Sequence, residues 1–462
     1  MSLFDTIISN LPEVRAPKQK RLSFKEKLKW TLIILVLFFV MGLIPLFGLG
    51  ENALQQFEFL SIILGASFGS ILSLGIGPIV TASIVLQLLS GTGILNLDLT
   101  KPEGKKRFQG LQKLLAIFFI IFEAGVYVMM GGLAPNPILA GTPLYGQMQF
   151  ILIFQLFLGG ILILFMDEVI SKWGFGSGIS LFIAAGVAQQ IFIRAFNFLP
   201  SPTNPEISAG AIPALFQSLS RGDITTAGLE IAAVVSTVLV FMICVYFQAI
   251  KAEIPLSFGR VRGYSMRWPL NFFYTSNIPV ILVSALLANV QLFARLFERW
   301  GHPILGSFSG NSPVSGIVFW VNSPDIVQNI IRGSFTFTQL GQALTYVVLM
   351  VVGAVIFSIF WMQTANMDAR SQAKQIMSSG LQIPGFRRDE RVLEKILSRY
   401  IWPLTIVGGA TVGLLAALAD LTGALSRGTG ILLTVMIIYK LYEEIAKQHM
   451  MDLNPTMRKF ME

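Results

Sequence analysis

Residues 340–362 of this chain read LGQALTYVVLMVVGAVIFSIFWM, a stretch of 23 residues without Lys, Arg, Asp or Glu. A helix needs about 20 consecutive apolar residues to cross the hydrocarbon core of a bilayer. The stretch therefore predicts a membrane-spanning helix. Ten apolar runs of this kind occur along the chain, and we expect each to span the membrane: Trp30–Leu49, Ile71–Leu89, Leu111–Met130, Met148–Met166, Ile179–Phe196, Ala227–Ile250, Ile278–Leu296, Leu340–Met362, Ile401–Ala419 and Thr429–Tyr442.

The composition supports a membrane protein. Of 462 residues, 54% are hydrophobic and 13% are charged, whereas a soluble domain carries about 25% charged residues. The formal charge of +9 could indicate a nucleic-acid partner, but the Lys and Arg residues cluster in the connectors between apolar runs. The single cysteine, Cys244, lies inside an apolar run, which rules out an intramolecular disulfide and disfavours a thiolate metal site.

The positions of the Lys and Arg residues predict the orientation of the runs, because positively charged segments stay in the cytoplasm. One alternate set of connectors, taken together with both termini, holds 28 Lys and Arg, and the opposite set holds 6. We therefore expect both termini in the cytoplasm, with tails at 1–29 and 446–462. The first tail has seven basic residues and no long apolar stretch, so it is unlike a cleavable signal peptide.

Five runs precede an outer polar connector at 199–226, and five follow it. The half at 227–445 then enters the membrane with the opposite orientation to the half at 30–198, as in an inverted repeat. This symmetry is inferred from the number of runs, so two unrelated halves stay open as an alternative.

Glycine and proline interrupt the second run at Leu74-Gly-Ile-Gly-Pro-Ile-Val80. Irregular backbone at membrane depth is tolerated only where it is buried in protein or lines a cavity. The interruption indicates a pore or a binding site, although a tight glycine contact between helices would give the same pattern. The segment before it, about 57–67, is too short to span, and it would either re-enter the membrane from outside or lie flat in the interface.

Few polar groups lie inside the runs, and Glu123 is the clearest of them. It should face protein or water, because an unpaired carboxylate in lipid costs about 3 kcal/mol. Such a residue would also suit a secondary transporter with five-plus-five inverted repeats, which stays open as an alternative to a channel. No helix shows metal-ligand spacing of His or carboxylates, and no phosphate-binding Gly-Lys-Ser/Thr loop occurs. The sequence therefore predicts neither an enzyme nor a cofactor.

Two connectors on the expected cytoplasmic side are rich in charge, at about 251–277 and 363–400. The first contains Gly259-Arg-Val-Arg-Gly263, and the second contains Gly385-Phe-Arg-Arg-Asp389 followed by an amphipathic helical pattern at Glu390–Tyr400. Basic protruding loops suit an RNA-rich or acidic partner. Attraction to anionic lipid headgroups would require the same charges without a partner.

At these residues the sequence resembles the SecY family, and the archaeal members more closely than the bacterial ones. The resemblance covers nearly the whole chain. Several motifs in the same order carry it: Phe24-Lys-Glu-Lys-Leu-Lys-Trp30, Leu74-Gly-Ile-Gly-Pro-Ile-Val-Thr81, Asp167-Glu-Val-Ile-Ser-Lys172, Gly176-Ser-Gly-Ile179, Leu181-Phe-Ile-Ala-Ala-Gly186, Ser276-Asn-Ile-Pro-Val-Ile-Leu282 and Gly428-Thr-Gly-Ile-Leu-Leu433.

The resemblance implies an all-α polytopic membrane protein, with ten transmembrane helices in two inverted five-helix halves that form an hourglass channel for polypeptides. Its waist would be a ring of apolar side chains, which blocks ions by dewetting but lets an extended chain through. By motif position the ring would be Ile76, Val80, Ile179, Ile183, Ile281 and Leu433. A plug that seals the waist from outside would include Phe57, Glu58, Phe59, Ile62 and Ile63.

The family also implies a lateral gate, where spans two and three part from spans seven and eight to release signal sequences and membrane helices into lipid. Thr81, Glu123 and Asn289 fall where the family places a polar cluster at that gate. Hydrogen bonds among them would hold the gate shut in the absence of a signal sequence.

Arg260, Arg262, Arg387 and Arg388 match the loops through which family members dock on the ribosome. The other implied partners are a SecE-type (gamma) subunit, a small beta subunit, signal sequences, nascent polypeptides and membrane lipid. The implied location is the cell membrane.

Overall fold

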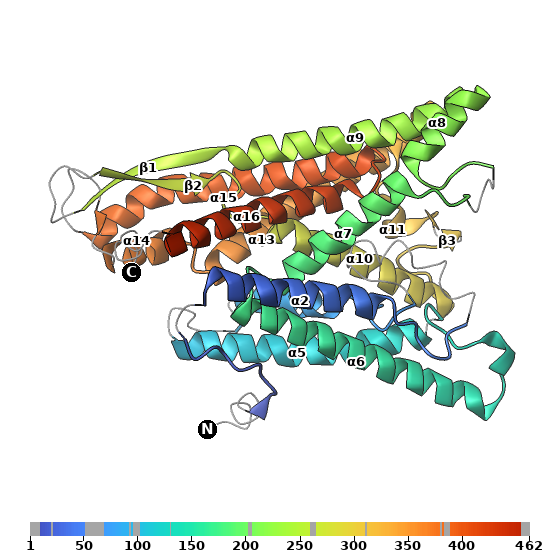
Figure 1. Cartoon of the computed structure of the whole chain (residues 1–462), viewed down its shortest axis with the longest axis horizontal. Helices are drawn as coiled ribbons and strands as arrows, with labels where there is room; N and C mark the ends of the chain where they lie inside the picture. The colour runs from blue at the N-terminus through green and yellow to red at the C-terminus, as the bar shows by residue number, and fades with distance from the viewer. Residues whose placement is uncertain are drawn as a thin grey trace.

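The computed structural model describes residues 10–19, 22–50, 69–91, 94–95, 102–129, 131–201, 206–258, 265–309, 312–378, 381–382 and 389–453. Within these residues, ten helices of at least 15 residues form a bundle, most of them running roughly along its long axis (Figure 1). They are α2 (Phe24–Gly42), α4 (Gly77–Gly91), α5 (Pro102–Met129), α6 (Pro143–Trp173), α7 (Gly178–Phe196), α9 (Ile224–Ala249), α10 (Ile278–Arg299), α13 (Phe337–Thr364), α15 (Glu390–Leu421) and α16 (Gly428–Leu453).

Each predicted run overlaps one of these ten helices. Seven described helices are long and apolar enough by themselves to cross a membrane. The other three helices are too short or too charged to meet that test. Helix α2 begins with several charged residues, α4 has 15 residues, and α16 carries Lys440, Glu443 and Glu444 in its second half.

The interrupted second run begins as turns at 71–76, and α4 starts only at Gly77. Gly75 has a φ of 55°, in the left-handed region that favours glycine. Pro78 follows in the first helical turn, where the N–H that proline lacks has no helical partner. A Cβ at Gly159 of α6 would lie 1.9 Å from the carbonyl oxygen of Ile71, so α6 packs directly on this irregular backbone. The turn is therefore held by protein, as the sequence required.

The amphipathic segment Glu390–Tyr400 and the run after it form one continuous helix, α15, with Pro403 inside it. Asp389 caps the start, where its side chain accepts the Arg391 N–H at 2.9 Å. Leu393 and Leu397 are buried against α14 (Ala369–Ser378) and the neighbouring sheet. This packing extends the helix beyond the membrane-spanning run.

The basic connector at 251–277 forms a β-hairpin that the sequence analysis did not predict. Strands β1 (Lys251–Phe258) and β2 (Ser265–Asn271) pair antiparallel, and β5 (Leu381–Gln382) joins β1 on its other edge. Ile254 and Leu270 are buried with the start of α15, so the hairpin has a small core of its own. In Figure 1 the two strands lie next to α15, at the end of the bundle that carries α14.

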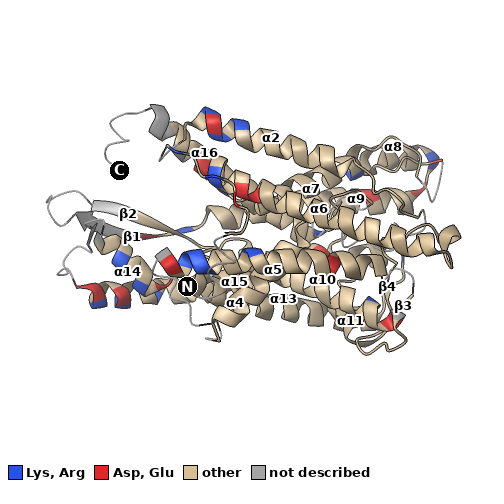
Figure 2. Ribbon diagram, turned by 90° about the horizontal axis from the view of Figure 1, so that it is seen from below, with Lys and Arg blue, Asp and Glu red and all other residues tan. Residues whose placement is uncertain are grey.

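The two ends of the bundle differ in charge. The hairpin, α14, the start of α2 and the end of α16 share one end, which we call the basic end (Figure 1). The opposite end, which we call the far end, carries the short elements η2 (Pro137–Leu139), α8 (Ala211–Arg221), β3 (Phe308–Ser309), β4 (Ser312–Pro313), α11 (Gly316–Val321) and α12 (Ile326–Ile331). In Figure 2 the charged residues gather at the ends, and the middle of the bundle carries few.

Large apolar side chains are exposed on the outer faces of the helices, among them Phe154, Phe241 and Leu344. Exposed apolar surface on this scale is unstable in water and is natural in lipid. A separate buried cluster fills the centre, and α4, α7, α10 and α16 all contribute to it. The functional site lies in that central cluster.

Candidate functional site

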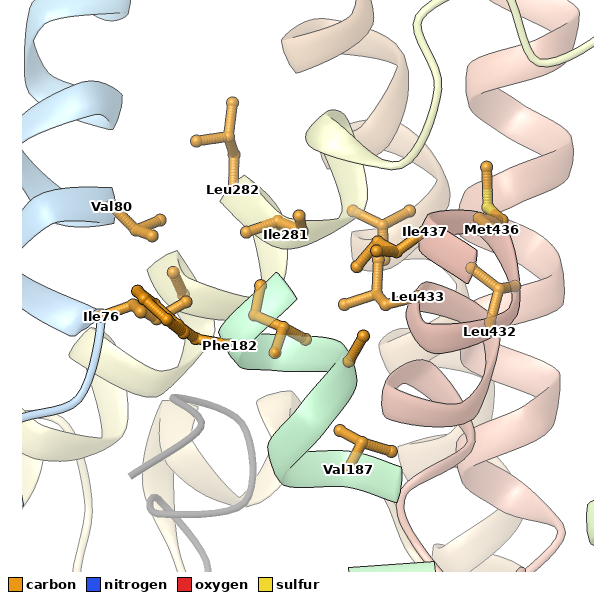
Figure 3. Close-up of a cluster of buried hydrophobic side chains, with 14 of the residues drawn as sticks. Ile76, Val80, Phe182, Val187, Ile281, Leu282, Leu432, Leu433, Met436 and Ile437 are labelled. Atoms are coloured by element: carbon orange, nitrogen blue, oxygen red, sulfur yellow. The ribbon is translucent and has the colours of Figure 1, made fainter. Parts of the chain in front are cut away.

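Apolar side chains from distant parts of the sequence meet at the centre of the bundle (Figure 3). Ile76 lies in the turn directly before α4, Val80 comes from α4, Ile183 from α7, Ile281 from α10 and Leu433 from α16. All five line one cavity of about 40 Å³, which we call the waist cavity. None of the five is more than 9% exposed. The structure therefore brings together five of the six side chains predicted for the ring.

A larger cavity of about 440 Å³, which we call the vestibule, lies on the basic-end side of the waist. Val80 and Ile281 line both cavities, so these two side chains form the boundary between them. Ile179, the sixth predicted ring residue, lines the vestibule and not the waist cavity. The vestibule walls also carry polar groups, namely Gln87, Gln112, Asp167, Asn277, Lys440 and Glu444. The vestibule, which has polar groups in its walls, therefore ends at the apolar side chains of the ring.

The motif around Asp167 fixes where α7 begins and hence where Ile183 lies. The Asp167 Oδ1 atom accepts the Ile179 N–H at 2.9 Å. A Cβ on Gly178 would lie 2.6 Å from the Cα of Asp167, so only glycine lets α7 start this close to α6. Ile183 follows Ile179 by one helical turn on the same face.

Thr81, Glu123 and Asn289 form one polar cluster, from α4, α5 and α10. The Thr81 hydroxyl lies 3.1 Å from Glu123 Oε1 and 2.9 Å from the Gly77 carbonyl oxygen, and Asn289 Nδ2 donates to Thr81 Oγ1 at 3.0 Å. The Glu123 side chain is buried. The sequence analysis grouped these residues by family position, and the structure places them within hydrogen-bond distance.

The cluster lies in a seam where α4 and α5 meet α10 from the other half of the chain. The rings of Phe122 and Phe293 are 6.4 Å apart across this seam. Ala288 and Leu292 of α10 share a buried apolar cluster with Ile120 of α5. Apolar packing and one polar cluster therefore close the seam.

A second buried polar cluster, not predicted from the sequence, lies on the far-end side of the waist. Tyr346, Asp420, Arg427 and Thr429 all line the waist cavity. Asp420 directly follows the ninth apolar run, and Gly428-Thr-Gly430 opens the next helix. The signal that could have revealed it was a carboxylate at the end of one apolar run, a short connector before the start of the next helix.

The plug residues Phe57, Glu58, Phe59, Ile62 and Ile63 lie outside the described residues, as do Arg260, Arg262, Arg387 and Arg388. The strands that lead into the two basic loops are described, and they pair with each other. Ser257 is opposite Gln382, and Phe258 is opposite Leu381. Among the described residues, no group of three or more His, Cys, Asp or Glu could hold a metal ion.

The fold and the site together define a helical membrane channel with an apolar waist and a closed seam at its side. The family described as SecY matches residues 70–442, and the plug domain of Sec61p matches residues 36–69. The chain belongs to the SecY family.

Full-length relatives support this assignment. The chain is 48% identical to the protein translocase subunit SecY of Methanothermobacter thermautotrophicus, over 99% of this chain and 98% of the relative. It is 44% identical to the protein translocase subunit SecY of Pyrococcus furiosus, over 97% of this chain and 96% of the relative.

Solved structures give the same result. A structure described as that of a protein conducting channel superposes with a TM-score of 0.83 at 41% identity, covering 97% of this chain and 98% of the other. Sec61 in the canine ribosome-channel complex from the endoplasmic reticulum superposes with a TM-score of 0.80 at 40% identity, with the same coverage. The ten-helix hourglass fold and the function of a protein-conducting channel are therefore confirmed. The chain is a channel subunit and not an enzyme, and the secondary-transporter alternative has no support.

Proposed function

We propose that the chain conducts secretory polypeptides across the cell membrane through the waist formed by Ile76, Val80, Ile183, Ile281 and Leu433, with Ile179 at its entrance. The observation that carries this proposal is the convergence of these side chains between the vestibule and the waist cavity. A narrow apolar constriction excludes hydrated ions but binds a passing chain weakly.

A photo-crosslinker placed at Ile183 tests this route. With ribosomes stalled on a secretory chain, we expect the probe at Ile183 to label the nascent chain. The matched control is a probe at Phe241, which is 52% exposed on the outer face of α9 and should label lipid instead. Equal labelling of the nascent chain at both positions would contradict the route.

We propose that the seam between α4 and α10 is the lateral gate for signal sequences and membrane helices. The bond between Thr81 and Asn289 crosses this seam, and Glu123 accepts from the same hydroxyl. The Thr81–Asn289 bond is made only when the seam is closed, so it favours the closed state, and Glu123 holds the Thr81 hydroxyl from the same side of the seam as α4. A Glu123→Gln variant should change how readily signal sequences open the channel, measured as export of reporters with graded signal sequences.

We propose that the ribosome docks on the basic end, through Arg260 and Arg262 in one loop and Arg387 and Arg388 in the other. The pairing of β1 with β5 supports this proposal. One loop follows β1 and the other follows β5, so the two loops begin on neighbouring strands. A related structure is described as a ribosome-channel complex. Alanine at all four arginines should weaken ribosome co-sedimentation and its salt dependence, whereas Arg221→Ala at the far end should change neither.

The orientation and the remaining partners belong to the same proposal. The basic end, with both termini, would face the cytoplasm, as the excess of Lys and Arg requires. The family resemblance supports a SecE-type (gamma) subunit and a small beta subunit as partners. Cysteine labelling from each side of sealed vesicles tests the orientation.

A further inference from the structure

The carboxylate of Asp420, at the end of α15, binds groups from two other helices. Its Oδ1 atom accepts the Thr429 backbone N–H at 2.8 Å, and its Oδ2 atom accepts the Tyr346 hydroxyl at 2.6 Å. The Thr429 hydroxyl also donates to Oδ2. Asp420 and Thr429 are 6% exposed, and Tyr346 is 4% exposed. One buried carboxylate thus connects α13, α15 and the first turn of α16.

The first turn of α16 fits closely against its neighbours. A Cβ on Gly428 would lie 2.0 Å from the carbonyl carbon of Ala419, and a Cβ on Gly430 would lie 3.1 Å from Val187 of α7. Backbone N–H groups at a helix start lack helical partners, and a negative charge there is favourable. Asp420 supplies this cap from the preceding helix, so it fixes α16 relative to α15.

The turn between α15 and α16 also holds α7. Arg194 of α7 donates to the Leu425 carbonyl oxygen at 3.3 Å. Leu433 follows Thr429 by one helical turn on the same face of α16, and both line the waist cavity together with Asp420. Ile183 of α7 lines the same cavity. Two ring side chains therefore belong to helices that are anchored at this turn.

We infer that Asp420 is a positioning residue for the waist, because its carboxylate holds α16 in the position that directs Leu433 into the ring. This inference rests on the proposed role of the ring. Truncation of Asp420 leaves the Thr429 N–H and the Tyr346 hydroxyl buried without their acceptor, which is unfavourable. The start of α16 then moves to recover hydrogen bonds, and the ring opens on the side of Leu433.

The test is ion leakage through the resting channel, measured as iodide influx into proteoliposomes that contain the full chain with its partner subunits. We expect Asp420→Ala to raise the leak several-fold. Asp420→Asn should leak less than Asp420→Ala, because Oδ1 of asparagine still accepts the Thr429 N–H, but more than the wild type, because Nδ2 cannot accept from the two hydroxyls that bond to Oδ2. Tyr346→Phe removes one donor and leaves the Thr429 bonds in place, so it should give a smaller increase.

Asp223→Ala is the matched control. Asp223 caps α9 with the same chemistry, accepting the Thr226 N–H at 3.1 Å and the Thr226 hydroxyl at 2.6 Å, but at the far end and away from the waist. Its loss should lower the unfolding temperature without a leak, which separates positioning from general stability. An equal leak from Asp223→Ala and Asp420→Ala would overturn the inference.

Leu433→Ala separates this inference from the proposed function. If Leu433→Ala leaks and folded Asp420→Ala does not, the ring stands and the positioning role is wrong. If Leu433→Ala does not leak either, the assignment of the waist itself fails. If the Asp420→Ala protein does not accumulate, the leak of Tyr346→Phe tests the positioning role of Asp420. An unchanged leak in Tyr346→Phe would then count against the inference.

Discussion

Gln155 shows how a polar side chain is accommodated at membrane depth in this chain. Its Oε1 atom accepts the Phe47 N–H at 2.9 Å, and its Nε2 atom donates to the Phe47 carbonyl oxygen at 3.1 Å. Residue 47 lies beyond the end of α2, so its backbone groups have no helical partner. The Gln155 amide therefore supplies the hydrogen bonds that the irregular backbone at Phe47 needs, because no water is available in the hydrocarbon core.

Asn289 gives a prediction at the residue scale. Asn289→Ala removes the hydrogen bond to Thr81 that crosses the seam. A hydrogen bond contributes about 1 kcal/mol net, or roughly a fivefold change in an equilibrium. We expect export of a reporter with a weakened signal sequence to rise about fivefold, measured as secreted reporter per cell.

Thr411→Ala is the control for that experiment, because the half-buried Thr411 hydroxyl donates to the Val407 carbonyl oxygen of its own helix, α15, and makes no bond across the seam. It should leave the reporter unchanged. Lower export from Asn289→Ala than from the wild type would show that the bond does not favour the closed seam.

At the scale of elements, two glycines in apolar helices differ in their surroundings. A Cβ at Gly159 would collide with the Ile71 carbonyl oxygen, whereas a Cβ at Gly125 of α5 would meet nothing within 4 Å. Gly159→Ala should destabilise the protein by about 1–3 kcal/mol through overpacking, seen as a lower unfolding temperature in detergent. Gly125→Ala should not lower it, and equal effects would mean that α6 does not pack tightly on the turn before α4.

The segment at 10–19 is attached to α6 by Lys172, which gives a pH prediction. Lys172 contacts the Glu13 carboxylate and the Val14 carbonyl oxygen, the latter at 2.6 Å. The hydrogen bond and charge of Lys172 lower the pKa of Glu13. A lowered pKa means that the ionised carboxylate stabilises the attachment at neutral pH, and that this contribution is lost as pH falls through the lowered pKa.

We therefore expect pepsin to cleave the chain near residue 15 faster as pH falls below the usual carboxyl range, after correction for the enzyme's own pH profile. Glu13→Gln should reduce the pH dependence of this cleavage, while Glu168 of α6, which accepts the Val14 N–H at 2.9 Å, remains. Glu206→Gln, which breaks a far-end ion pair with Arg221, should preserve it. An unchanged profile in Glu13→Gln would show that another group controls the attachment.

The sequence predicted elements better than it predicted contacts. Apolar length located all ten helices, because lipid imposes that length on every span. It did not reveal the hairpin at 251–271, since the charges that marked the connector say nothing about strand pairing. Nor did it find the partners of Asp420, because Tyr346 is 74 residues away in sequence. The gate cluster was named from family position, and its hydrogen bonds needed coordinates.

At the scale of the whole molecule, the proposed lateral gate requires the two halves to separate at the seam. Cysteines at Phe122 and Phe293, whose rings lie 6.4 Å apart, can be joined by a short reducible crosslinker in a Cys244→Ala background. We expect the crosslink to block insertion of a membrane helix, and reduction to restore it. The measurement is alkaline extraction of a newly made membrane protein.

The control pair is Phe247 and Phe273, whose rings are 6.1 Å apart and which both belong to the second half. A crosslink there should not affect insertion. Normal insertion through a channel locked between Phe122 and Phe293 would place the exit elsewhere.

Val80 and Thr81 are neighbours on α4, and Ile281 and Asn289 share α10. The same two helices thus carry residues of both the proposed ring and the proposed lateral gate. In the proposed function, a movement of α4 or α10 that widens the ring also strains the Thr81–Asn289 bond, so opening along the channel axis and opening of the seam are coupled.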